Sequence, residues 1–357
     1  MDNLKLNMIL TSLSNTAIDM YAEYGEKMLL SLNHWITEEQ QTCRFSTISS
    51  VDLLLNNHRN HLGFITQVIA SRDADALIKA LPWVYHTYHN QGVPFIYFEE
   101  ELRKWKELIL KTIPINEAQQ LAQLYDWMLS VHEECCTVIN SEMEESFIDS
   151  NNPFFQHIIN GEQHLAFQYA TQKVNSWAEF ETFFNEEAQP CLYQVGLLWQ
   201  NGTVSVSIEH LATAITNRVL IGLIMKIPPP EITKQKVLVA CVESEQHQIG
   251  SWMVATALEA DEWDVAFLGA DTPRVALMDY IKNESPKAVI ISLTMPHSIK
   301  NTQQVLKEIQ TSYPDIKTVV GGQALSFFDK PETTLCADLI SSNYQEVIVQ
   351  LNVWLSD

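Results

Sequence analysis

KVLVACVESEQHQIG, residues 236–250, marks the point where the pattern of the chain changes. Its first seven residues form a short, continuous run rich in β-branched side chains, which is typical of a strand buried on both faces. A polar turn with one histidine, His247, follows, and a helical pattern begins near Gly250. Strand-like and helix-like segments then alternate five times, with further strands expected in WDVAFLG, AVIISLT, KTVVGG and ADLISS. This alternation predicts a doubly wound, flavodoxin-like sheet of five parallel strands in residues 236–357.

The turn that follows the first strand is the candidate binding site. In doubly wound sheets, ligands bind at the carboxyl ends of the strands, near the point where the strand order reverses, so we expect His247 at that edge. A neutral imidazole is a good ligand for a borderline transition metal such as cobalt. Glu245 and Ser292 are both placed to hold the other ring nitrogen of His247 and so to orient the ring.

Glycines near the same edge indicate the shape of the ligand. Gly250, Gly321 and Gly322 would let a large flat ligand approach the backbone closely. The turn does not have the pattern of a phosphate-binding loop, because neither G-x-G-x-x-G nor a Walker lysine follows the first strand.

The chain upstream of the sheet is predicted to be helical. Apolar residues recur at three- and four-residue spacing through residues 1–145, with a break at Gly92 and Pro94, which predicts an all-helical first domain. The polar, acidic stretch 139–153 is expected to end that domain.

A second helical domain is expected in residues 152–227. Its segments suggest a four-helix bundle, with a turn at Asn201 and Gly202 and with Ser205 as the cap of the last helix. Three consecutive prolines in residues 226–235 indicate a stiff linker to the sheet.

Composition limits the classes of partner. Lys and Arg total 22 and Asp and Glu total 44, which gives a formal net charge of −22. This charge repels polyphosphate and anionic lipid, so we expect neither direct nucleic-acid binding nor membrane attachment. We also expect no transmembrane helix and no signal peptide. The six cysteines lack metal-site spacing, and Cys135 and Cys136 are adjacent, so a reduced, cytoplasmic protein is expected.

Residues 245–250 have the pattern E-x-H-x-x-G, which is accompanied by Ser292, by Gly321-Gly322 and by EWDVAFLGADTP at 262–273. This combination resembles the cobalamin-binding domain of the methionine synthase and methylmalonyl-CoA mutase superfamily. The resemblance covers residues 236 to about 350 and implies that His247 replaces dimethylbenzimidazole as the lower axial ligand of cobalt. The family motif usually begins with Asp, whereas this chain has Glu245, which is one methylene longer. The resemblance implies cofactor-binding roles for Glu245, Gln246, His247, Ile249, Gly250, Ser292, Leu293, Thr294, Gly321, Gly322 and Gln323.

The bundle carries a second motif, W-x9-E-H, at Trp199, Glu209 and His210. It resembles the signature of the cobalamin-dependent photoreceptors of the CarH and LitR type. The resemblance implies that Trp199 covers the upper face of adenosylcobalamin, and that Glu209 and His210 lie close to the adenosyl group. Light would then break the cobalt–carbon bond and change the state of a homo-oligomer, a dimer or tetramer, that signals to an unknown downstream protein.

Two features depart from those photoreceptors. In those photoreceptors, the residue after the tryptophan is a histidine that captures cobalt after illumination. The corresponding residue of this chain is Gln200. The photoreceptors also begin with a basic winged-helix domain, whereas residues 1–145 here are acidic and helical. We therefore expect an output other than direct DNA binding.

The first domain is rich in aromatic residues and histidines. WVYHTYHNQGVPFIYF, residues 83–98, reads as the wall of a pocket for a flat conjugated ligand. A helical, globin-like domain beside a cobalamin photosensor resembles the photocobilins, which bind biliverdin as a second chromophore. Haem is the rival ligand, and a partner-binding or dimerisation domain with aromatic core residues is the alternative. The candidate contacts of a second chromophore are His86, His89, Tyr85 and Tyr97.

Three functions compete. A cobalamin light sensor, a signalling protein rather than an enzyme, accounts for both motifs. A corrinoid methyl carrier of a methyltransferase system would use the same His247 but needs no capping tryptophan. A subunit of an adenosylcobalamin mutase would require a barrel for radical chemistry, and we find no barrel pattern in the sequence.

Overall fold

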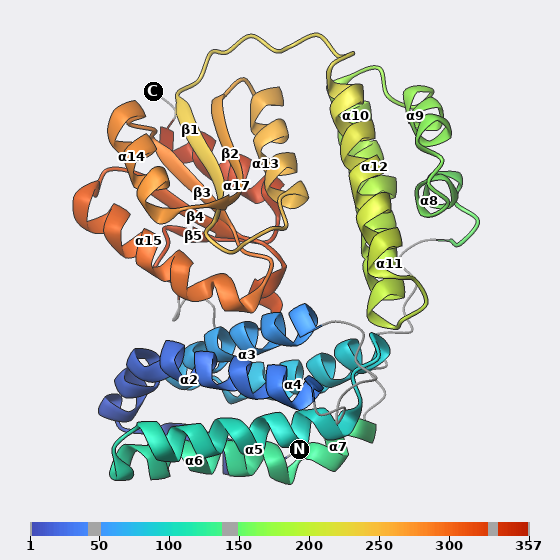
Figure 1. Ribbon diagram of the computed structural model, residues 1–357. Coiled ribbons are helices and arrows are strands. Elements are labelled where there is room, and N and C mark those ends of the chain that lie inside the picture. Colours follow the sequence, from blue (N-terminus) through green and yellow to red (C-terminus); the bar gives the residue numbers. More distant parts are fainter. Residues whose placement is uncertain (1, 42–50, 138–148, 328–334, 356–357) are drawn as a thin grey trace.

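The computed structural model describes residues 2–41, 51–137, 149–327 and 335–355, and all structural statements concern these ranges. It consists of an N-terminal layer of helices, a helical bundle, and a parallel sheet covered by helices on both faces (Figure 1). The sheet and its helices lie over the N-terminal layer, and the bundle stands beside both (Figure 1). Within the described residues, no helix is long and apolar enough to cross a membrane.

The N-terminal layer, defined as α1–α7, confirms the helical character predicted for this part of the chain. Gly92, at φ +93°, lies in the break between α4 and α5, where a residue with a side chain would be strained. The acidic stretch 139–153 falls largely outside the described residues. The helices are α1 Asn3–Ser12, α2 Asn15–Gln41, α3 Val51–Ser71, α4 Ala74–Asn90, α5 Phe95–Thr112, α6 Ile115–Ser130 and α7 His132–Thr137.

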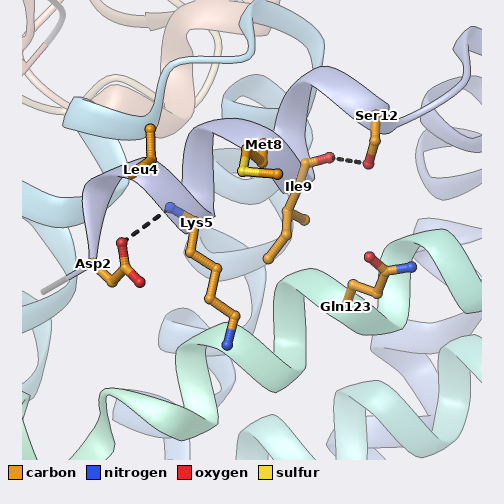
Figure 2. A pocket seen from close by; sticks show the side chains of 7 residues that line it. All are labelled: Asp2, Leu4, Lys5, Met8, Ile9, Ser12 and Gln123. Carbon is orange, nitrogen blue, oxygen red and sulfur yellow. Dashed lines mark hydrogen bonds between the residues drawn. The ribbon is translucent and has the colours of Figure 1, made fainter.

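A hollow lies between side chains of α1 and α6 in the N-terminal layer (Figure 2). Its lining comes from α1, the residue that caps α1, and α6. Two of the lining side chains, Leu4 and Met8, are largely exposed. The lining residues are Asp2, Leu4, Lys5, Met8, Ile9, Ser12 and Gln123.

The bundle confirms the four predicted helical segments. A π-helical turn, η2, joins α10 to α11 without a break, so the two form one long segment. Pro190 follows this turn, and a π-turn accommodates a residue that lacks an N–H donor. The Ser205 hydroxyl caps α12 by accepting a bond from the Ile208 amide, as predicted. The elements are α8 Pro153–Ile159, α9 Gln163–Thr171, α10 Trp177–Phe183, η2 Phe184–Ala188, α11 Gln189–Gln200 and α12 Val206–Ile224.

The C-terminal part forms the predicted doubly wound sheet. Its five strands are all parallel, in the order β2-β1-β3-β4-β5, which is the flavodoxin-like order. The strands are β1 Lys236–Val242, β2 Asp264–Thr272, β3 Ala288–Ser292, β4 Lys317–Gly321 and β5 Leu339–Ile340. The helical elements are α13 Ile249–Ala260, α14 Arg274–Glu284, η3 Pro296–Ser298, α15 Ile299–Ser312, η4 Gln323–Phe327 and α17 Tyr344–Leu355.

Strand register brings the candidate residues to one edge. Cys241 of β1 pairs with Ser292 of β3, and Ser292 pairs with Gly321 of β4. The loops that follow these three strands therefore begin at the same level. The strand order reverses between β1 and β3, so the edge is the ligand-binding position of this fold.

The N-terminal layer packs against the loops at this edge. Helix α3 contacts η3 and α15, and α4 contacts η4. Trp83 of α4 meets the ring of Phe327 edge-on, with 6.3 Å between the ring centroids. One buried apolar cluster runs from the N-terminal helices to Leu293 and Leu325, which follow β3 and β4.

Candidate functional site

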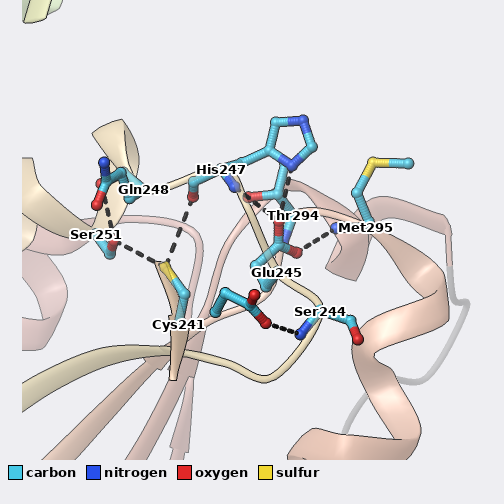
Figure 3. A network of polar contacts seen from close by, with 9 residues as sticks. Cys241, Ser244, Glu245, His247, Gln248, Ser251, Thr294 and Met295 are labelled. Carbon is cyan, nitrogen blue, oxygen red and sulfur yellow. Dashed lines mark hydrogen bonds and ion pairs between the residues drawn. The ribbon is translucent and has the colours of Figure 1, made fainter. Parts of the chain in front are cut away.

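Glu245 and His247 form the centre of the candidate site, in the loop between β1 and α13 (Figure 3). The Nδ1 atom of His247 lies 2.7 Å from Oε1 of Glu245. The same oxygen accepts the backbone N–H of His247 at 3.0 Å. The other oxygen, Oε2, accepts the backbone N–H groups of Thr294 and Met295, each at 2.9 Å. One carboxylate thus fastens the loop after β1 to the loop after β3.

The longer side chain at the start of the motif suits this arrangement. Glu245 is fully buried, yet its two oxygens reach partners on different loops. Burial alone would raise the pKa of Glu245. The hydrogen bonds from His247 and from the Met295 amide outweigh burial and lower the pKa, so the carboxylate is charged at neutral pH.

The charged carboxylate of Glu245 orients the ring of His247. The hydrogen bond to Glu245 raises the pKa of His247, burial opposes the rise, and the charge of Glu209 in the bundle adds to it. In the neutral ring, Nδ1 carries the proton and donates it to Glu245, which leaves the lone pair on Nε2. The side chain is 57% exposed, and Nε2 has no hydrogen-bond partner among the described residues. The ring is therefore prepared to offer Nε2 to a metal ion outside the loop.

The chemistry of the donors matches a single axial ligand. No group of three or more His, Cys, Asp or Glu side chains in the described ranges could hold a metal ion. A metal ion bound to His247 would need most of its ligands from a group other than the protein. A metal ion held in a macrocycle has such ligands. The residues present therefore fit a corrinoid.

A smaller polar network, which the sequence analysis did not single out, supports the loop from behind (Figure 3). The Cys241 thiol lies 3.1 Å from the Ser251 hydroxyl, which donates to the carbonyl of Gln248 at 2.8 Å. The side-chain oxygen of Gln248 accepts the Ala270 amide at 3.2 Å and so ties the loop to β2. These bonds join the ends of different elements, and no local sequence signal indicates them.

Ser292 and the paired glycines have structural reasons for their identity. Ser292 ends β3 and is largely buried, and its hydroxyl forms no hydrogen bond with His247 in the described structure. Gly322 has φ +118°, and a Cβ there would lie 2.3 Å from the Leu293 carbonyl oxygen. A Cβ at Gly321 would lie 2.7 Å from the Ser341 carbonyl oxygen. Close approach of protein backbone, rather than of a ligand alone, therefore requires these glycines. Gly250, in contrast, faces open space.

The remaining positions of the sheet edge vary in exposure. Gln246 and Gln323 are exposed, Ile249 and Thr294 are half-buried, and Leu293 is buried. Leu293 contributes to the apolar core, while Thr294 contributes its backbone amide to Glu245.

The bundle presents its own motif residues near the ends of α11 and α12. Trp199 lies in the last turn of α11, and its indole N–H is buried with no hydrogen-bond partner in the described ranges. Glu209 lies in the first turn of α12, where it accepts bonds from Thr213 at 2.9 Å and from His210 at 2.5 Å. His210 itself is 76% exposed. The charge of Glu209 also contributes to the raised pKa of His247.

The four candidate contacts of a second chromophore all have protein partners. His86 bonds the Cys135 carbonyl and His89 the Val93 carbonyl, both at 3.0 Å. Tyr85 and Tyr97 are buried in the core of the N-terminal layer. The hydroxyl of Tyr85 lies 3.2 Å from Nδ1 of His132, and that of Tyr97 lies 2.5 Å from Nε2 of His58.

A buried polar cluster in the same layer centres on Glu101. Burial raises the pKa of Glu101 to about 8, although Trp105 and Asn57 donate hydrogen bonds to it. Burial lowers the pKa of both His58 and His61 to about 3, so both rings are neutral. The sequence shows these residues only as members of an aromatic-rich helical segment, because their contacts join different helices.

Comparison with known proteins agrees with this geometry. Residues 235–348 match one family model described as "B12 binding domain", and residues 151–223 match a second model with the same description. The matched ranges cover the sheet with His247 and the bundle with Trp199. Two parts of the chain, the sheet with its helices and the bundle, are therefore each similar to a B12-binding domain.

The curated relatives fall into two groups. The chain is 27% identical over 143 residues to the HTH-type transcriptional repressor CarA of Myxococcus xanthus, which is 40% of this chain and 49% of the relative. It is 27% identical over 142 residues to the repressor CarH of the same organism, covering 40% and 47%. It is also 26% identical over 141 residues to the trimethylamine corrinoid protein of Methanosarcina barkeri, covering 36% and 65%. The chain thus spans about half of each repressor and less than two thirds of the corrinoid protein.

Two solved structures are similar in part. The Methanosarcina barkeri monomethylamine corrinoid protein aligns with 60% of this chain and 100% of its own, at 18% identity and a TM-score of 0.46. A cobalamin-binding protein from Desulfitobacterium hafniense aligns with 57% of this chain and 97% of its own, at 18% identity and a TM-score of 0.33.

Proposed function

We propose that this protein is a cobalamin-dependent light sensor that binds adenosylcobalamin between the bundle and the sheet. The observation that carries the proposal is the arrangement of His247, whose Nδ1 is held by the buried Glu245 while its side chain is 57% exposed and its Nε2 has no hydrogen-bond partner among the described residues. The W-x9-E-H motif favours a sensor over a carrier, and the similarity to two Myxococcus transcriptional repressors supports a regulatory role.

The residues have distinct roles in this proposal. His247 would bind the cobalt through Nε2, Glu245 would fix the ring, and the loops at the glycine-rich edge would hold the rest of the cofactor. Trp199 would cover the adenosyl group, and Glu209 and His210 would lie beside it. When bound, adenosylcobalamin supplies a cobalt–carbon bond that green or blue light breaks. Without the adenosyl group, Trp199 would lose its contact with the cofactor, and the bundle would be free to shift against the sheet.

The wider assignments follow from the same proposal. Residues 1–145, 152–227 and 236–357 act as sensor or partner domain, cobalamin cap and cobalamin-binding domain. The protein is a cytoplasmic signalling homo-oligomer rather than an enzyme. The N-terminal layer takes biliverdin as a second chromophore, with haem as the rival.

A corrinoid methyl carrier is the second candidate function. The Methanosarcina trimethylamine corrinoid proteins, at 26% and 25% identity, favour it. A carrier would use His247 in the same way and would bind methylcobalamin, but it gives Trp199 no role.

Absorption spectra of the purified chain with adenosylcobalamin, before and after green light, test the proposal, with size-exclusion chromatography on both states. We expect a histidine-ligated spectrum that changes on illumination together with the elution volume. His247→Ala should lose the histidine-ligated spectrum. A spectrum that is unchanged by light, combined with methyl transfer to a thiol, would support the carrier instead. Biliverdin added to the same sample should produce a red absorption band if the N-terminal layer binds it.

A further inference from the structure

The C-terminal end of α4 is bonded to the turn that carries Trp199. The side-chain N–H of Asn90 donates to the Gln200 carbonyl at 2.8 Å, and that of Gln91 donates to the Trp199 carbonyl at 2.7 Å. Both acceptors lie at the C-terminal end of α11, where helix carbonyls lack partners within their own helix. Two amide side chains of the N-terminal layer therefore cap the helix that presents Trp199.

The turn after α11 is also shaped to accept α4. A Cβ at Gly202 would lie 2.8 Å from the Asn90 carbonyl oxygen, and the residue has φ +75°. Only a glycine allows both the turn and the close approach. The contact between α4 and the bundle therefore consists of closely packed backbone atoms in addition to the two hydrogen bonds.

The same helix reaches the sheet one to two turns earlier. Trp83 of α4 meets Phe327, and α4 contacts η4, which directly follows Gly321 and Gly322. Trp83 and Asn90 are seven residues apart, so they lie on one face of the helix about 10 Å apart. Thr87, between them on this face, is buried, and its hydroxyl has no partner in the described ranges. Helix α4 thus spans from the sheet edge to the end of α11.

Trp199 is held through its backbone rather than through its side chain. Its indole N–H has no hydrogen-bond partner in the described ranges, whereas its carbonyl accepts bonds from Gln91 and from the Gly202 amide. The position of the Trp199 backbone is therefore set by where α4 holds the turn.

We infer that Asn90 and Gln91 are positioning residues for Trp199, and that α4 couples the N-terminal layer to the upper face of the cofactor site. This coupling rests on the proposed function, since it requires Trp199 to cover the adenosyl group. Binding free energies are reciprocal, so a ligand that fixes Trp199 also fixes α4, and a change in α4 alters the preference for that ligand. The signal from the cofactor enters the N-terminal layer at α4.

The test compares wild type with the double variant Asn90→Ala/Gln91→Ala. Dark titrations give the affinities for adenosylcobalamin and for methylcobalamin. Two lost hydrogen bonds should weaken adenosylcobalamin binding by about tenfold, and methylcobalamin binding by less than about twofold, because only the adenosyl group contacts Trp199. Gln310→Ala is the matched control, since it removes another amide bond to a backbone carbonyl, that of Cys336, within the sheet region.

Amide exchange supplies a second readout. Bound cobalamin should slow exchange in residues 84–91 of the wild-type chain and of Gln310→Ala, but not of the double variant. Gly202→Ala, which disturbs the same contact from the side of the bundle, should reproduce the loss if the double variant folds poorly.

The two proposals fail in different ways. If the wild-type chain binds adenosylcobalamin and responds to light, but the double variant keeps the wild-type affinity ratio and exchange protection, the coupling is wrong and the light sensor stands. If the wild-type chain has no preference for adenosylcobalamin and no light response, the proposed function is wrong. The exchange protection measured with bound adenosylcobalamin then decides the coupling on its own, and equal protection of residues 84–91 in wild type and double variant would overturn it.

Discussion

At the scale of single residues, the Glu245–His247 pair is the most specific feature of the chain. A fully buried carboxylate with three backbone amide bonds is fixed in place, so the imidazole bonded to it is fixed as well. The hydrogen bond to the charged Glu245 raises the pKa of His247. Protonated His247 therefore adds to the free energy of unfolding at low pH, and this contribution is lost as the pH rises through the pKa of His247 in the folded state.

Glu245→Gln tests this electrostatic role. The substitution keeps the size of the side chain and removes its charge, so the pKa of His247 should fall relative to wild type. An NMR titration of the His247 ring in the cofactor-free protein measures it. Cobalamin affinity should fall about 10- to 100-fold, because the partner of a metal-bound histidine orients the ring. Glu243→Gln, on the exposed neighbour, is the control, and an equal effect of both variants would contradict the assigned role.

Glu101→Gln tests the buried cluster of the N-terminal layer. The pKa of Glu101 is raised to about 8 in the folded state, so the folded chain holds a proton that the unfolded chain loses near pH 4.5. Between these values, this group makes the free energy of unfolding fall by up to ~1.4 kcal/mol for each unit of rising pH. The Gln variant should lack this slope in denaturant titrations from pH 5 to 8. An unchanged slope, equal to that of the exposed-site control Glu133→Gln, would show that Glu101 is ionised when folded.

At the scale of elements, β1 and β3 could be predicted because each is a buried and nearly continuous apolar run. The helices could be predicted because their apolar spacing follows the helical period. The loop that carries His247 could be placed at the correct edge for the same reason. The partners of Glu245 could not, because Thr294 and Met295 contribute backbone amides from a loop about fifty residues away. A local sequence pattern reports the periodicity of one element, but it does not report which backbone groups of one loop form hydrogen bonds with another loop.

Gly322→Ala tests the packing of the loops after β3 and β4. The new Cβ would collide with the Leu293 carbonyl, and φ +118° is unfavourable for alanine. We expect the free energy of unfolding to fall by about 3 kcal/mol, measured by chemical denaturation without cofactor. A loss below about 0.5 kcal/mol would mean that the two loops separate readily.

Gly250→Ala separates ligand contact from protein packing. A Cβ at Gly250 meets open space, so the stability of the cofactor-free chain should be unchanged or slightly higher. Cobalamin affinity, measured by spectral titration, should nevertheless fall at least tenfold if the corrin lies against this glycine. Unchanged affinity would remove Gly250 from the cofactor site.

At the scale of the whole molecule, the sequence indicates separate helical and sheet regions, but the folded chain joins them. The buried apolar cluster of the N-terminal layer continues into the loops that follow β3 and β4. These contacts could not be predicted, because the apolar faces of α3 and α4 look alike whether they meet another helix or a loop. The N-terminal layer therefore packs against the same loop whose backbone amides donate hydrogen bonds to Glu245.

Leu293→Ala tests this connection. Leu293 is fully buried in the cluster shared with the N-terminal layer, so its truncation should cost about 2–5 kcal/mol. Leu351→Ala is the matched control, because Leu351 is also fully buried but belongs to the cluster on another side of the sheet. Amide exchange in α3 should accelerate in Leu293→Ala well before global unfolding, and it should not do so in Leu351→Ala. If both variants accelerate α3 equally, the N-terminal layer responds only to overall stability. A selective effect of Leu293→Ala would show that the loop beside Glu245 transmits its state to α3 through shared packing.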